Sequence, residues 1–92
     1  MENIDYEYSE EEKAWVSPEI TLQRNIYLMI NLKSPGKVIV RQSNSKGEFP
    51  RVPIKKHHDT SEFAFRIRVI PDTVTVQIFT STEPKEIKYA YI

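Results

Sequence analysis

Few side chains of this sequence have obvious chemical potential, and they form no catalytic pattern. His57 and His58 are adjacent, and neighbouring side chains of an extended strand point to opposite faces, so they are poorly placed to bind one metal ion together. His57 and Asp59 share a face, but two ligands make a weak zinc or copper site. No Ser-His-Asp arrangement, paired-carboxylate spacing or glycine-rich phosphate loop is present. We therefore expect no catalytic residue, no metal site and no cofactor, and the sequence predicts that the protein is not an enzyme.

Charge is distributed unevenly along the chain, although the formal net charge is zero. Residues 1–12 contain six acidic and no basic residues, so thirteen bases stand against seven acids in the rest of the chain. Such segregation is found in proteins that bind polyanions and also on ordinary solvated surfaces. If their strands lie side by side, the outward bases form a candidate binding face for single-stranded nucleic acid: Lys37, Arg41, Lys55, Lys56, Arg66 and Arg68.

Aromatic side chains suggest two further kinds of partner. Trp15, the only tryptophan, and Tyr89 and Tyr91 are candidate stacking residues for a sugar ring, with core packing as their alternative role. The final strand that carries the two tyrosines could instead pair with another chain by strand addition.

The central stretch of the chain has to position these groups, and it has the two-residue period of β-strands. One face carries Ile26, Leu28, Ile30 and Leu32, and the next run carries Val38 and Val40. Pro35-Gly36 between the runs predicts a type II turn, with glycine supplying the positive φ. Because type II turns splay paired strands, we expect this link to be an arch between two packed sheets.

The same alternation recurs in the rest of the chain. We expect strands within Ala14–Leu22, interrupted at an edge or bulge by Pro18, and within Glu62–Ile70, Thr73–Thr80 and Glu86–Ile92. Residues 43–48 read as a loop, and two prolines make residues 49–54 an irregular or edge segment. The predicted inward residues of the later strands are Phe63, Phe65, Ile67, Val69, Val74, Val76, Ile78, Ile87, Tyr89 and Tyr91.

About seven such strands without a helical pattern predict an all-β protein. We expect an antiparallel two-sheet sandwich, immunoglobulin-like or fibronectin-III-like, formed by residues 14–92 as one domain. Residues 1–13 are expected to be an acidic, flexible and disordered amino-terminal arm, although Ile4, Tyr6 and Tyr8 alternate as in an edge strand.

Composition leaves the compartment open. The chain has no cysteine, no run of about 20 apolar residues and no signal-peptide pattern, so we expect no membrane span and either a cytoplasmic protein or a trimmed exported domain.

The predicted function is that of a non-catalytic interaction or structural module in a larger protein assembly or at a cell surface. We expect a protein partner, and the alternatives are nucleic acid and carbohydrate.

Overall fold

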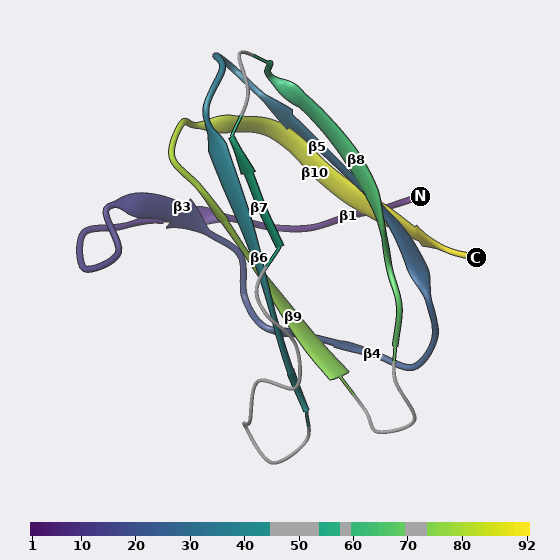
Figure 1. The fold of residues 1–92 in the computed structure, drawn as a ribbon. Coiled ribbons are helices and arrows are strands. Elements are labelled where there is room, and N and C mark those ends of the chain that lie inside the picture. The colour runs from purple at the N-terminus through teal and green to yellow at the C-terminus, as the bar shows by residue number, and fades with distance from the viewer. Residues whose placement is uncertain (45–53, 58–59, 70–73) are drawn as a thin grey trace.

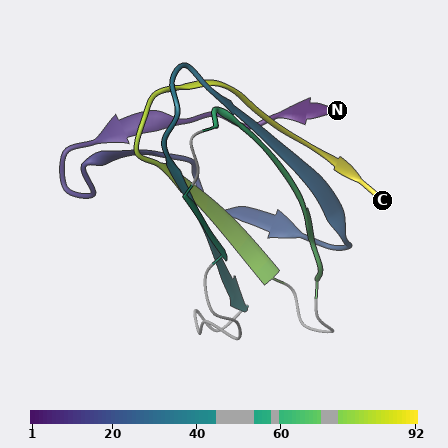
Figure 2. The same cartoon turned by 45° about the horizontal axis from the view of Figure 1, so that its top comes forward.

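A computed structural model of the protein (Figures 1 and 2) describes residues 1–44, 54–57, 60–69 and 74–92, with the side chains of residues 54–57 and 74 outside the description. All of the regular structure in these residues is β-strand, as predicted. The strands are β1 (Glu2–Asn3), β2 (Glu7–Ser9), β3 (Ala14–Val16), β4 (Ile20–Leu22), β5 (Ile26–Leu32), β6 (Lys37–Asn44), β7 (Ile54–His57), β8 (Glu62–Ile67), β9 (Val74–Thr80) and β10 (Pro84–Tyr91).

The strands form two antiparallel sheets that face each other (Figure 1). Sheet 1 has the order β1-β10-β5-β8, and sheet 2 has the order β2-β3-β9-β6-β7. Strand β4 also pairs with β9, so β3 and β4 share one edge of that strand on either side of Pro18. The interruption predicted at this proline is therefore confirmed.

The core lies between the sheets and contains the predicted inward faces. In β5, Ile26, Leu28, Ile30 and Leu32 are at most 2% exposed, and in β6, Val38 and Val40 are fully buried. Burying one such aliphatic side chain stabilises the fold by roughly 1.5–3 kcal/mol, so the period-two pattern of this stretch determines its orientation. Phe65 and Val69 are only partly buried and pack against the edge of the core.

The link from β5 to β6 crosses from sheet 1 to sheet 2, so the predicted arch is confirmed. The predicted role of Gly36 is wrong, because its φ lies outside the left-handed region. Its backbone instead lies close to Thr82, and a Cβ atom at position 36 would be 2.5 Å from the Thr82 Oγ1. That hydroxyl donates a hydrogen bond to the carbonyl oxygen of Ser34 at 2.8 Å. Glycine is needed here for space.

The pairing order shows how the chain is wound. Strand β1 pairs with β10, β3 and β4 pair with β9, β5 pairs with β8, and β6 pairs with β7. The first half of the chain thus pairs with the second half as one long antiparallel ribbon. This ribbon is rolled up so that β10 also pairs with β5 and β9 with β6. This connectivity, with two Greek keys in two facing sheets, is that of a jelly roll.

The immunoglobulin-like or fibronectin-III-like topology is not confirmed. An immunoglobulin sandwich places its first two strands side by side in one sheet, whereas here β1 and β2 belong to different sheets. The chain also changes sheet from β4 to β5, from β5 to β6, from β7 to β8, from β8 to β9 and from β9 to β10. Alternation along single strands sets which face is buried, and it carries no information about which distant strand becomes the neighbour.

The amino-terminal segment belongs to both sheets, and the predicted disordered arm is not confirmed. Strand β1 lies on sheet 1 and β2 on sheet 2, and Ile4 between them is 6% exposed in the core. The Ile4 amide donates to the Ile87 carbonyl oxygen at 2.7 Å, and the Tyr6 hydroxyl donates to the Pro84 carbonyl oxygen at 2.9 Å. Burial of these alternating residues outweighs the tendency of the acidic neighbours to stay solvated.

Candidate functional site

Strands β2 and β3 form a hairpin that extends beyond the rest of the sandwich (Figures 1 and 2). We call residues 7–16 the amino-terminal hairpin. Its turn is closed by Ser9, whose Oγ accepts the Glu12 amide at 3.2 Å, and Lys13 completes it in the left-handed region with a φ of 53°. The hairpin places β2 at the edge of sheet 2, and among the described strands β2 pairs with β3 alone.

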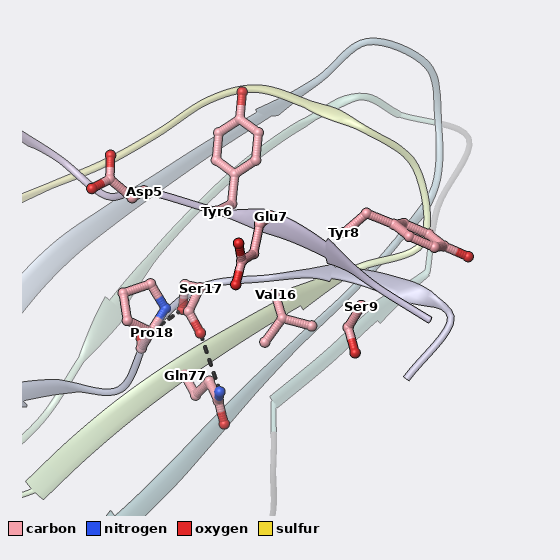
Figure 3. A pocket seen from close by; sticks show the side chains of 9 residues that line it. All are labelled: Asp5, Tyr6, Glu7, Tyr8, Ser9, Val16, Ser17, Pro18 and Gln77. Atoms are coloured by element: carbon pink, nitrogen blue, oxygen red, sulfur yellow. Dashed lines mark hydrogen bonds between the residues drawn. The ribbon is translucent and has the colours of Figure 1, made fainter. Parts of the chain in front are cut away.

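A groove of about 620 Å³ lies where the hairpin meets β9 (Figure 3). Glu7 is in register with Val16, and Val16 with Phe79, so these residues share the outer face of sheet 2. Gln77 lies on the same face of β9, and Pro18 closes the end of the groove where the chain leaves β3. The volume is within the range of small-ligand and peptide pockets.

Ser17 fixes the wall of this groove. It is 2% exposed, and its amide donates to the Ile78 carbonyl oxygen at 2.9 Å. Its Oγ accepts the Ile78 amide at 2.9 Å and donates to the Pro18 carbonyl oxygen at 3.0 Å. The Gln77 side-chain amide donates to the Ser17 carbonyl oxygen at 3.1 Å (Figure 3). The amide and hydroxyl of Ser17 thus join the segment between β3 and β4 to Ile78 of β9, and these hydrogen bonds hold this wall of the groove in place.

An aromatic pair lies on the opposite face of the hairpin. The Tyr8 and Trp15 rings are in register and meet edge to face, with centroids 4.9 Å apart. Tyr8 is 47% exposed and Trp15 is half-buried. The hairpin therefore presents a polar acidic face and an aromatic face on either side of one free edge.

The acidic residues gather around this hairpin. Asp5, Glu7 and the three glutamates of the turn at positions 10–12 are all exposed. The ion pairs among the described side chains join Lys33 to Glu83 and Lys88 to Glu86, and none involves an acid of the hairpin. Unpaired carboxylates in one place create a negative field that attracts a basic partner.

The bases predicted to form one binding face lie on two opposite sheets. Lys37 and Arg41 are on the outer face of sheet 2, where the Arg41 guanidinium lies 4.7 Å from the centroid of the Phe79 ring. Arg66 is in register with Tyr27 on the outer face of sheet 1, and Arg68 follows the end of that strand. The structure therefore does not bring these bases together on one face. The structure does not describe the side chains of Lys55 and Lys56.

The tyrosines of the last strand are engaged in contacts within the protein. The Tyr89 and Tyr91 rings meet edge to face with centroids 5.7 Å apart, and the Arg24 guanidinium lies 4.8 Å from the centroid of the Tyr91 ring. The Tyr89 hydroxyl donates to the Glu2 carboxylate at 2.8 Å. This hydrogen bond, together with partial burial and the negative charge of Glu2, raises the pKa of Tyr89 to about 12.

The last strand is less accessible for strand addition than its sequence indicated. Strand β10 lies between β1 and β5, and β1 covers its outer edge at Lys88 and Tyr89. Among the described strands, the edge strand on this side of sheet 1 is β1, and the edge strand of sheet 2 next to the hairpin turn is β2.

The described residues offer neither a metal-binding cluster nor a membrane-spanning helix. Residues 1–44, 60–69 and 74–92 contain no group of three histidine, aspartate or glutamate side chains that could hold a metal ion, while His58, Asp59 and the His57 side chain lie outside the description. The described part of the chain contains no helix long and apolar enough to cross a membrane.

Sequence reasoning missed most of the groove residues. The sequence marks Pro18 as an edge or bulge position, but no pattern in it marks Glu7, Ser17 and Gln77, because positions 7 and 77 come together only through the pairing of β2, β3 and β9. The alternation of Ile4, Tyr6 and Tyr8 was the available signal that the acidic segment is part of a sheet. Comparison of the chain with protein-family models, curated proteins and solved structures found no match.

Proposed function

We propose that this chain is a non-catalytic interaction module that binds a protein partner through the amino-terminal hairpin. The observation that carries the proposal is the position of this hairpin: it extends beyond the sandwich, its outer strand β2 has one open edge, and its exposed acids have no ion-pair partner among the described side chains. The preformed groove beside it supplies further contact area. Jelly rolls support many activities, so the proposal rests on this site and not on the fold.

The two alternative functions have less support. Binding of a polyanion would need the bases on one surface, and they are divided between the outer faces of the two sheets. The groove would repel phosphate groups through Asp5 and Glu7. Stacking on a sugar would need open ring faces, and Trp15, Tyr89 and Tyr91 each contact another ring or a guanidinium.

A matched pair of charge reversals tests the proposal. Glu7→Lys changes an exposed strand glutamate on the hairpin, and Glu62→Lys makes the same change on the outer face of sheet 1. With the wild-type chain as bait in an extract of the native cells, we expect a partner that Glu62→Lys retains and Glu7→Lys loses by about tenfold or more, with salt weakening the contact.

Two results would contradict this function. One is a partner that is held equally by both variants, which would place the contact elsewhere. The other is tight, salt-sensitive binding of labelled single-stranded RNA or DNA by the wild-type chain, which would favour the polyanion alternative.

A further inference from the structure

We infer that the partner of the amino-terminal hairpin is an extended basic segment that pairs with β2 as an additional strand of sheet 2. The inference rests on the proposed function, because it takes the hairpin as the contact surface, and it adds the conformation and the chemistry of what is bound.

The open edge of β2 provides the backbone groups for this pairing. Glu7, Tyr8 and Ser9 pair with Val16, Trp15 and Ala14 on one side, and sheet 2 ends on the other side. Such an edge leaves alternate N–H and C=O groups unpaired, which is the template used in β-strand addition. The Asp5 to Ser9 segment also lines the groove, so an added strand would lie beside it.

Strand register indicates which side chains the partner needs. Glu7 and Ser9 lie on the same face of the hairpin as Val16, and Tyr8 lies on the other face together with Trp15. Residues directly opposite each other on neighbouring strands interact, and opposite charges stabilise the pair. The added strand therefore needs a lysine or arginine opposite Glu7 and an apolar residue opposite Tyr8, which means alternating basic and apolar residues. The acids of the turn at positions 10–12 extend the attraction for bases beyond the strand itself.

The two edges of sheet 1 fit this partner less well. Strand β1 has two residues, one fewer than β2, and the carboxylate of its Glu2 already accepts a hydrogen bond from Tyr89. Strand β8 carries Glu62 and Arg66 on its outer face, so it presents charges of both signs. The edge of β2 combines an open ladder with charge of a single sign.

Backbone methylation of a peptide tests the inference directly. The probe is a peptide of about eight residues with alternating lysine and valine, and two versions of it carry N-methyl groups on every lysine or on every valine. An added strand bonds to its neighbour through the N–H groups of alternate residues only, so only one methylated version can keep these bonds. Binding is followed by the emission of Trp15, the only tryptophan, which lies in contact with Tyr8.

We expect the unmodified peptide and one methylated version to bind with similar affinity, and the other version to bind about tenfold or more weakly. Glu7→Gln should weaken binding and reduce its salt dependence, while Glu62→Gln, with the same change of charge on sheet 1, should do neither.

Two results would overturn the inference. If both methylated versions bind like the parent peptide, the contact is electrostatic without strand pairing, and the hairpin remains the contact surface. If none of the three peptides binds, a basic extended segment is not the ligand, and the capture experiment with Glu7→Lys decides separately whether the hairpin binds a protein.

Discussion

Tyr89 joins the two ends of the chain through a single hydrogen bond. Its hydroxyl donates to the Glu2 carboxylate at 2.8 Å, and the two residues are in register between β1 and β10. Loss of the phenolic proton would place a phenolate against this carboxylate and remove the donor. The same interaction that fastens β1 therefore raises the pKa of Tyr89 from 10.0 to about 12.

The stability of the protein should depend on this proton at alkaline pH. Because the pKa is higher in the folded state than the ordinary value of 10.0, the folded state holds the proton more tightly, and the stabilisation is fully present below pH 10 and is lost as pH rises toward 12. Urea unfolding of the wild-type chain and of Tyr89→Phe across this range measures the effect. We expect the difference in free energy of unfolding between the two proteins to shrink as pH rises. An unchanged difference would show that the Tyr89 hydroxyl is not coupled to folding.

Gly36 and Gln42 illustrate what single residues reveal in a sequence. The arch after β5 was predicted correctly from Pro35-Gly36, but the reason was wrong, because Gly36 makes room for Thr82, a residue far along the chain. Gln42 is 3% exposed on the inner side of β6, where its side-chain oxygen has no hydrogen-bond partner among the described residues. A glutamine is usually exposed, so the residue type does not predict that Gln42 is buried. The burial follows only from its position, two residues after Val40 on the inner face of the strand.

At the scale of elements, the amino-terminal segment shows where sequence reasoning failed. Six acids in twelve residues favour disorder by composition, yet β1 and β2 belong to different sheets and Ile4 fills the core between them. Strands β5, β8 and β9 were predicted well because their apolar faces repeat over several residues, whereas β6 extends to Asn44, two residues into the predicted loop, and β7 was not predicted as a strand. Strands of two or three residues, such as β1 and β2, carry too few repeats for that pattern to outweigh composition.

A matched pair of isoleucine truncations tests whether the amino-terminal segment contributes to folding. Ile4→Ala removes a side chain that is 6% exposed, and Ile92→Ala removes the same atoms where the side chain is 62% exposed. We expect Ile4→Ala to lower the free energy of unfolding by about 2–4 kcal/mol and Ile92→Ala to change it by less than about 0.5 kcal/mol. Chemical denaturation measures both. Equal, small effects would restore the disordered arm that composition predicted.

At the scale of the whole molecule, the rolled ribbon pairs the first strand with the last. Glu2 lies beside Tyr89, whereas the innermost pair joins Val40 to Ile54. Closing a loop costs entropy that rises with the length of the loop. The innermost strands can therefore pair first, and each pair that forms shortens the loop that the next pair has to close. The pairing order of the jelly roll thus implies a sequence of assembly in which β1 docks last.

This order predicts how Ile4→Ala changes the folding kinetics. If β1 docks after the rate-limiting step, Ile4 makes no native contact in the transition state, so its loss should leave the folding rate nearly unchanged. The unfolding rate should rise by about 30-fold or more, the factor that corresponds to about 2 kcal/mol. Stopped-flow fluorescence of Trp15 over a range of urea concentrations measures both rates.

A core control, Val40→Ala in the innermost pair, should slow folding instead, because Val40 contacts form early. A slower folding rate for Ile4→Ala with unchanged unfolding would mean that the two ends of the chain meet first, and the inferred order of assembly would have to be reversed.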